Sequence, residues 1–433
     1  MAWFGGRKKQ EPAVVEEIPE EPRLPEPPAL NASGLRSVAD HSAYLLSLVK
    51  PLEPFGTSLL EAWDQVMCED IDSSINVPPN STAKVAGYAV RAADLMDDEG
   101  HLAEPLDIVE AGVERLPERA AVVVSPGDVL PRGANAVLPE TFATLEDSHA
   151  HLIEKVAEGE YVRAAGEHLA VGTRLLSEGE TLDDRAMGLL AGAGIDKVMV
   201  RPRPRVVVVS SGENLVDPGA EVNHGDATDA NSYMISAAAR AAGATVFRVA
   251  VHSNDPDAIR TAITDQLIRA DLVISTTGGR REDYEAVAGV MNELGLVDSV
   301  DVAMSPGRTQ TFGLIGEDDE RVPMLMLPGN PVSAYVSFHA FARPLIRQLM
   351  GARTDHRAVR AITSTMLRSS QGTMHLLRGR VTLEGSIRHV EQVAMPHALG
   401  ELSQANAFII LDESVETVKA GQAVKVWLFD EED

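Results

Sequence analysis

One short stretch, residues 322–333, constrains the fold of this chain more than any other. An apolar run over 322–327 predicts a buried strand, and the sequence Pro-Gly-Asn-Pro follows it directly. Glycine permits a sharp turn, asparagine is a good helix N-cap, and proline suits the first position of a helix. A strand that runs straight into a capped helix forms an anion-receptive turn at the carboxyl edge of a sheet. From these residues alone, an anion site and an ordinary strand–helix turn remain equally good interpretations.

The chain around this stretch alternates between strand and helix patterns over residues 205–352. The predicted strands are Val206 to Val209, Thr245 to Val251, Leu272 to Thr276, Thr311 to Ile315 and Val322 to Leu327. The predicted helices are Ala230 to Ala242, Asp255 to Ile268, Tyr284 to Leu294 and Pro331 to Met350. This order predicts a central α/β domain with a doubly wound, mainly parallel sheet.

The flanking segments predict further parts of an α/β multidomain protein. Residues 1–33 are rich in proline and glutamate and lack the apolar surface needed to offset chain entropy, so we expect a disordered tail. Residues 34–75 and 167–204 predict a discontinuous first domain, with helices at Ser37 to Val49, Ser58 to Val66 and Asp183 to Ala193. Short alternating runs predict an inserted β-rich domain at 76–166 and a small C-terminal β domain at 353–433.

Composition excludes several classes of function. The formal net charge is −27, which repels nucleic acids and anionic membranes, so we expect no nucleic-acid partner. Cys68 is the only cysteine, so neither an intrachain disulfide nor a cysteine metal cluster can form, and a cytoplasmic setting fits best. The histidines show no metal-ligand spacing, and no apolar run is long enough to span a membrane.

Several motifs follow one another in an order that resembles the MoeA/gephyrin-E family, the molybdopterin molybdenumtransferases, from Ser37 to Phe429. They are Leu327 to Ala334, Ser210 to Leu215, Asp229 to Asn231, Val77 to Pro79, Gly87 to Val90 and Gly133 to Val137. The resemblance implies an elongated homodimer whose active cleft lies between the central domain of one subunit and the inserted domain of the other. It also implies an enzyme that takes adenylylated molybdopterin and molybdate, hydrolyses the adenylyl group with a divalent cation, and inserts molybdenum.

Position by position, the chain departs from the family pattern at charged residues. Ala86, Asn214 and Asn254 stand where the family has carboxylates, and Asp301 and Ser305 stand where it has lysines. The loop after the third predicted strand is shorter, although it gains two arginines. A charge beside a phosphate contributes on the order of 1–4 kcal/mol near a surface, and its sign changes when lysine becomes aspartate. These departures predict a degenerate transferase site without catalytic residues, a metal or another cofactor.

The same departures favour a non-enzymatic, gephyrin-like dimeric scaffold. Relatives that resemble this chain imply binding of the C-terminal tail of the tubulin-like division protein FtsZ, together with a membrane receptor at the division site. The peptide groove would lie between the central and C-terminal domains and would comprise Asp40, Tyr44, Tyr335, Phe338, Phe408, Leu411 and Asp412. Aromatic residues at helical spacing are, however, equally typical of a core.

The alternative is a working molybdenumtransferase that uses Mg²⁺, molybdopterin and molybdate at a remodelled site. Its residual catalytic candidates are Asp229 and Asp283. The ligand-binding remnant would comprise Gly278, Gly279, Arg308, Pro328, Gly329, Asn330, Pro331 and Ser333. A third hypothesis is a small-ligand sensor that keeps the fold and some affinity for a pterin. Turnover of adenylylated molybdopterin separates the enzyme from the other two.

Overall fold

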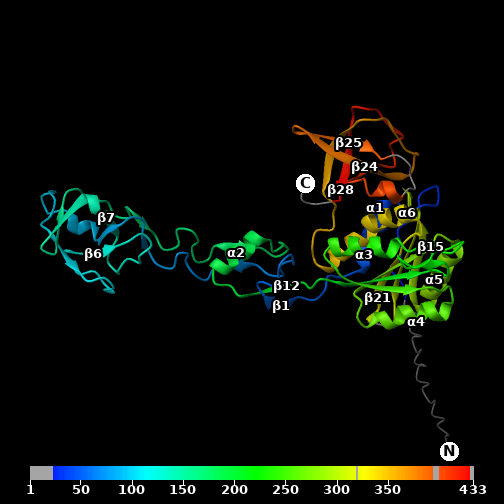
Figure 1. Ribbon diagram of the computed structural model, residues 1–433, viewed down its shortest axis with the longest axis horizontal. Coiled ribbons are helices and arrows are strands. Elements are labelled where there is room, and N and C mark those ends of the chain that lie inside the picture. The colour runs from blue at the N-terminus through cyan, green and yellow to red at the C-terminus, as the bar shows by residue number, and fades with distance from the viewer. Residues whose placement is uncertain (1–22, 318–319, 394–398, 430–433) are drawn as a thin grey trace, which may run out of the picture. The chain divides into compact units, whose positions relative to one another are not determined.

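The computed structural model describes residues 23–317, 320–393 and 399–429, so most of the predicted tail lies outside the described residues. The chain divides into two compact units (Figure 1). The larger unit combines the segments 1–50, 204–346 and 354–433, and the smaller unit combines 51–203 and 347–353. Within the described residues, no helix is long and apolar enough to cross a membrane.

A mainly parallel sheet forms the centre of the larger unit, as the sequence predicted, although it has six strands where five were predicted. Its order is β16 (Thr245–Val251), β13 (Arg205–Ser211), β17 (Leu272–Thr277), β21 (Val322–Met326), β20 (Thr309–Ile315) and β18 (Gly295–Asp301). The first four strands are parallel, and β20 runs antiparallel to both of its neighbours. The valine and isoleucine side chains of β13 and β17 are fully buried, as expected for strands with helices on both faces.

Helices cover both faces of this sheet (Figure 1). The helices α4 (Pro256–Leu267) and α5 (Arg281–Leu294) pack on one face, where Ile263 and Met291 share a core with Val273. The helix α3 (Asn231–Ala241) lies on the other face against α6 (Pro331–Ser337). The sheet therefore places the turns after β13, β17 and β21 at one edge, where several helices begin.

A second six-stranded sheet forms the C-terminal β domain of the larger unit. Its order is β19 (Met304–Ser305), β24 (Met374–Glu384), β25 (Ile387–Gln392), β22 (Ala358–Thr363), β28 (Ala423–Leu428) and β26 (Ala407–Leu411). Val390, Ile409 and Val426 are fully buried in its core. The strand β19 comes from the central part of the chain and pairs in parallel with β24, which ties this domain to the central one.

The smaller unit is mainly β-structure. One sheet has the order β7 (Ala136–Pro139), β4 (Gly87–Val90), β6 (Ala120–Val124), β5 (Leu106–Val109), β9 (His149–Leu152) and β8 (Ala143–Glu146). In a second core of this unit, α2 (Asp184–Gly192) packs with the segment that follows β1 (Phe55–Ser58). The division into first, inserted, central and C-terminal domains at the stated residue limits stays a prediction.

The helix predicted at Ser58 to Val66 is wrong. The residues before it form β1, which pairs antiparallel with β12 (Lys197–Val200), and turns follow over 59–64. The amide of Leu59 donates to the carbonyl oxygen of Asp196 at 2.9 Å, and Ala62 is fully buried. A partner strand from a distant part of the chain therefore outweighs the local helical pattern.

The long helix predicted at 331–350 follows one path but changes its winding. The α-helix α6 passes into a π-helical segment, Phe338–Ala342, and then into α7 (Arg343–Leu349). Phe338 and Phe341 on this segment are buried. The rings of His41 and Phe341 meet edge to face, with 4.8 Å between their centroids. Nothing in the sequence signals this change, because Phe-His-Ala-Phe-Ala also suits an ordinary α-helix.

The predicted peptide groove is not open in this structure. Phe338 and Phe408 are fully buried, and Leu411, which is 2% exposed, belongs to the internal core of the C-terminal β domain. The Tyr335 ring packs against Phe408, and its centroid lies 6.0 Å away. Tyr44 is also buried, and its hydroxyl donates to the carbonyl oxygen of Pro25 at 2.9 Å. Of the seven predicted groove residues, Asp40 and Asp412 are the exposed ones.

Candidate active site

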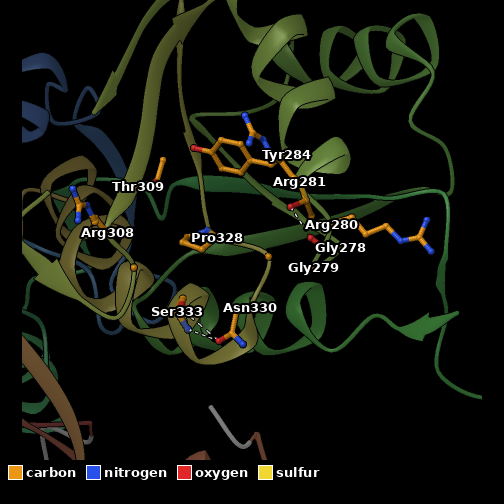
Figure 2. Close-up of a pocket in the computed structure, with 13 residues that line it drawn as sticks. Gly278, Gly279, Arg280, Arg281, Tyr284, Arg308, Thr309, Pro328, Asn330 and Ser333 are labelled. Atoms are coloured by element: carbon orange, nitrogen blue, oxygen red, sulfur yellow. Dashed lines mark hydrogen bonds between the residues drawn. The ribbon is translucent and has the colours of Figure 1, made fainter. Parts of the chain in front are cut away.

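A cleft of about 400 Å³ lies at the edge of the central sheet where β17 and β21 end (Figure 2). Three segments build it: the turn after β17, the approach to β20, and the turn into α6. It is lined by Thr277, Gly278, Gly279, Arg280, Arg281, Tyr284, Gly307, Arg308, Thr309, Pro328, Gly329, Asn330 and Ser333. Seven of the eight residues predicted to bind a ligand are therefore brought together, and Pro331 is the one that does not line the cleft.

Two turns that are distant in sequence touch at the floor of the cleft. A Cβ atom placed at Gly329 would lie 2.0 Å from the carbonyl oxygen of Gly278. No side chain fits there, so glycine is required by the close approach of the two backbones. Asn231, at the start of α3, donates from Nδ2 to the carbonyl oxygen of Gly329 at 2.7 Å and holds the turn from the other side.

The two helices that begin at the cleft differ in how their first amides are used. At α6, the Oδ1 atom of Asn330 accepts hydrogen bonds from the amides of Val332 at 3.1 Å and Ser333 at 3.2 Å, so Asn330 is the N-cap that the sequence predicted. At α5, Arg280 occupies the N-cap position and no side chain caps the helix. The start of α5 therefore keeps backbone donors for an anion.

Three arginines lie on the rim of the cleft, Arg280 and Arg281 on one side and Arg308 on the other (Figure 2). Arg281 pairs with Glu285 at 2.6 Å, and Arg308 pairs with Asp301 at 2.9 Å. Both of these arginines are exposed, so an incoming anion can compete for their guanidinium groups. Among the described residues, Arg280 has no ion-pair partner within 4 Å.

Tyr284 forms part of the wall behind Arg281. Its hydroxyl lies 2.8 Å from Oγ1 of Thr311 on β20, which joins α5 to the sheet. Burial raises the pKa of Tyr284, so this hydroxyl stays protonated near neutral pH. Tyr284, Thr277 and Thr309 were not predicted as site residues. Thr277 lies at a strand end directly before a glycine, which is a usable signal, whereas Thr309 and Tyr284 carried none.

A second hollow of about 290 Å³ adjoins the cleft and shares Gly307 and Arg308 with it. It lies between the segment at 302–308 and the C-terminal domain, which contributes Ser370, Thr373 and His375. Arg308 consequently borders both spaces, and its guanidinium can serve a ligand in either one.

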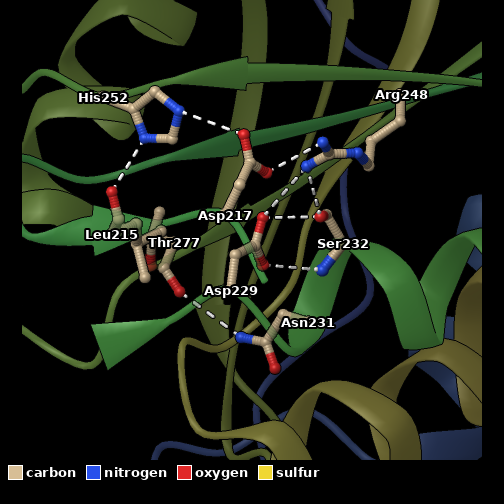
Figure 3. A network of polar contacts seen from close by, with 8 residues as sticks. All are labelled: Leu215, Asp217, Asp229, Asn231, Ser232, Arg248, His252 and Thr277. Atoms are coloured by element: carbon tan, nitrogen blue, oxygen red, sulfur yellow. Dashed lines mark hydrogen bonds and ion pairs between the residues drawn. The ribbon is translucent and has the colours of Figure 1, made fainter. Parts of the chain in front are cut away.

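Asp229, one of the two catalytic candidates, holds the start of α3 and does not line the cleft (Figure 3). Its carboxylate accepts hydrogen bonds from the amide of Ser232 at 3.0 Å and from its hydroxyl at 2.5 Å. Arg248 lies 3.6 Å from the same carboxylate and also pairs with Asp217 at 2.9 Å. These contacts give Asp229 the role of a helix cap that is only 2% exposed.

Asp283, the other candidate, is 3% exposed and lies beneath the turn after β17, outside the lining of the cleft. Its Oδ1 atom accepts a hydrogen bond from Nδ2 of Asn254 at 2.7 Å. In the sequence, Asn254 suggests a lost carboxylate, whereas in the structure its amide donates to a buried charge.

The fold and the cleft define an α/β protein with an arginine-rimmed cleft at the edge of a mainly parallel sheet. Three family profiles match the chain: the MoeA N-terminal region (domain I and II) at 36–194, a probable molybdopterin binding domain at 207–348, and the MoeA C-terminal region (domain IV) at 360–429.

Relatives cover almost the whole chain. Molybdopterin molybdenumtransferase 1 of Mycobacterium tuberculosis is 34% identical in an alignment of 421 residues, which covers 90% of this chain and 98% of that protein. The molybdopterin molybdenumtransferase of Haemophilus influenzae is 28% identical and covers 89% of this chain and 96% of its own length. The crystal structure of a molybdopterin biosynthesis MoeA protein from Pyrococcus horikoshii matches with a TM-score of 0.80 and 26% identity, over 92% of this chain and 99% of that one. The chain belongs to the MoeA family.

These findings overturn three expectations. The chain was expected to be a scaffold for the FtsZ tail with a membrane receptor at the division site, not to be an enzyme, and to use no cofactor. Its curated relatives are named molybdopterin molybdenumtransferases, which supports the enzyme hypothesis and the use of molybdopterin, and nothing supports the scaffold. The error came from treating each changed charge as a separate loss, whereas Asn254 and Asp301 have partners within the fold and the two arginines gained after β17 border the cleft.

Proposed function

We propose that this protein is a molybdopterin molybdenumtransferase that inserts molybdenum from molybdate into adenylylated molybdopterin at the cleft between β17 and β21. One observation carries the proposal. The cleft gathers three arginines and contains no acidic residue among its described lining, in a chain whose formal net charge is −27. Guanidinium groups gathered at one cleft favour a phosphorylated ligand that the rest of the surface repels.

The residues suggest how the phosphate groups of the ligand would be held. The uncapped start of α5 offers backbone amides, and Arg280 and Arg281 add charged donors beside them. Arg308 lies on the opposite rim (Figure 2), and its guanidinium would bind the ligand from that side. The hydroxyls of Thr277, Thr309 and Ser333 line the space between and can orient the polar edge of a pterin.

The resemblance implies Mg²⁺, but the described residues do not fit a resident metal site. No group of three or more histidine, cysteine or carboxylate side chains among them could hold a metal ion. Asp229 caps α3, and Asp283 is buried against Asn254. We therefore assign no step to a cation, and the proposal concerns the binding and orientation of the substrates by this chain's own residues.

The test is turnover. The purified protein is supplied with adenylylated molybdopterin and molybdate, with and without Mg²⁺, and active molybdenum cofactor is measured by reconstitution of an apo-molybdoenzyme. We expect turnover, and we expect Arg280→Ala to raise KM about tenfold or more, because a hydrogen bond to a charged group contributes about 1.5–3 kcal/mol. Arg260→Ala is the matched control, because Arg260 on α4 pairs with Glu293 on α5 and does not line the cleft. Absence of turnover under conditions in which a curated relative is active would refute the proposal.

We also propose that the protein is a homodimer, and that the smaller unit forms the interface. Leu60 is 81% exposed, Trp63 54% and Leu189 41%, although the elements that carry them share one core. Large, exposed apolar side chains on elements that pack together are typical of a protein–protein interface. Light scattering should show a dimer, and Leu60→Asp should shift it towards monomer. Ile268→Asp, at an isolated site that is 92% exposed on the larger unit, should leave it unchanged.

A further inference from the structure

One buried carboxylate lies where three loops of the central domain meet. Asp283 is the third residue of α5, so its charge sits at the favourable end of the helix. A Cβ atom placed at Gly278 would lie 2.2 Å from Oδ2 of Asp283, and one placed at Gly212 would lie 3.4 Å from it. The carboxylate therefore packs directly against the turn after β17 and closely against the turn after β13.

The third loop, between β16 and α4, supplies the hydrogen-bond donor. Nδ2 of Asn254 lies 2.7 Å from Oδ1 of Asp283. The Oδ1 atom of Asn254 is buried and has no partner among the described groups, so Asp283 decides which way the amide points. A buried carboxylate is costly unless it accepts hydrogen bonds, and this amide meets part of that requirement.

We propose that Asp283 and Asn254 form a positioning pair that fixes the loop Gly278–Arg281 in the shape that presents the start of α5 and its two arginines to the ligand. Neither residue touches the ligand. The pair acts through Gly278, whose carbonyl oxygen in turn lies against the Gly329 turn. This inference rests on the proposed function for the identity of the ligand, whereas the geometry of the loop stands without it.

The amide matters because it is a donor that needs neither a proton nor a cation. A second carboxylate at position 254 would face Asp283 at hydrogen-bonding distance, and two such charges cannot both stay ionised there without a counter-charge. Asparagine in place of the family's carboxylate at position 254 thus changes how the loop Gly278–Arg281 is held in position.

The experiment compares Asn254→Asp, Asp283→Asn and the double variant that exchanges the two side chains. The first measurement is the rate at which trypsin cleaves the folded protein after Arg280 and Arg281, which reports the order of the loop without any ligand. The second is the Kd for molybdopterin. Asp257→Asn is the matched control, because Asp257 is exposed in the first turn of α4.

We expect Asn254→Asp to raise both the cleavage rate and the Kd about tenfold, because the like charges at positions 254 and 283 then push the start of α5, with the loop Gly278–Arg281 that leads into it, away from the loop between β16 and α4. Asp283→Asn should raise both by less, since two amides can still form one hydrogen bond. The exchanged pair should return to within about threefold of the native protein, because it restores one carboxylate and one donor. Such a rescue shows an interaction between the two positions, which a general loss of stability would not produce.

The inference is overturned if Asn254→Asp leaves the rate of cleavage after Arg280 and Arg281 unchanged. It is also overturned if the rate in the exchanged pair equals that expected from the two single variants combined. Should Asn254→Asp fail to fold, Asn254→Ala removes the donor without adding a charge, and unchanged cleavage in that variant would also overturn it. If the native protein does not bind molybdopterin while the cleavage rates follow the pair, the proposed function fails and the positioning role stands.

Discussion

The contact between the two glycine turns gives the sharpest prediction, the effect of Gly329→Ala. The new Cβ atom would lie 2.0 Å from the carbonyl oxygen of Gly278, and separations below 3.0 Å are essentially never found for real Cβ atoms. The turn must therefore retreat by about 1 Å. Because misplacing a site by that distance can cost about 100-fold in rate, we expect kcat/KM to fall by about two orders of magnitude.

The same movement should lower stability. The bond from Asn231 to the carbonyl oxygen of Gly329 is 2.7 Å long, and a retreat of about 1 Å is enough to break it. A buried group that loses its partner costs about 1–3 kcal/mol, which should appear in urea unfolding. Kinetics and unfolding are therefore measured on the same preparation, because both effects follow from one displacement.

Gly289→Ala is the control for this variant. Gly289 lies in the middle of α5, and no neighbouring heavy atom lies within 4 Å of the position that a Cβ atom would occupy. Alanine there should therefore leave kcat/KM unchanged and add about 0.5–1 kcal/mol of stability. If kcat/KM of Gly329→Ala stays within about threefold of the native value and the variant unfolds at the same urea concentration as the native protein, the two turns do not touch as described.

Three further predictions concern the same unit. Burial and the nearby Arg36 charge lower the pKa of His41 to about 4. Up to about 3 kcal/mol of stability is therefore present above pH 6.5 and is lost as the pH falls towards 4. In His41→Gln, the free energy of unfolding should not fall with pH over this range. Arg36→Ala leaves the Asp298 carboxylate, which Arg36 contacts at 2.5 Å, without its partner and should cost about 3–5 kcal/mol in urea unfolding. Asn231→Ala should lower stability by about 1–3 kcal/mol and reduce kcat/KM, because the carbonyl oxygen of Gly329 loses its donor; unchanged kinetics would contradict the role given to this bond.

Much of the central domain was predictable because its signals are local. The strand at Thr245 to Val251 was predicted with the bounds that the structure shows, and the N-cap at Asn330 follows from the residues beside it. The strand β18 was missed, since Leu-Val-Asp-Ser-Val-Asp directly follows a helix and is polar enough to suggest a loop. Its pairing with β20 supplies the order that the local sequence lacks.

In the candidate site, too, features set by neighbouring residues were predictable and those set by distant segments were not. Glycine, asparagine and proline after a buried strand marked the turn at 328–331, because their backbone preferences act over a few residues. What the neighbouring charges do was misjudged, because a side chain's partner depends on the packing of distant segments. Asn254 and Asp283 are 29 residues apart in sequence, and no local pattern showed that the amide would support the carboxylate.

The amino-acid sequence was thus sufficient to specify most of the central elements, the residues that meet at the edge of the sheet where the cleft lies, and the family to which the chain belongs. The folded chain was needed to show that Gly278 and Gly329 touch, that Asp229 caps a helix, and that the aromatic residues beside Tyr335 form a core rather than a groove. The difference is one of range. Backbone preferences act between neighbours in the chain, whereas hydrogen-bond partners and burial are set by segments that meet only after folding.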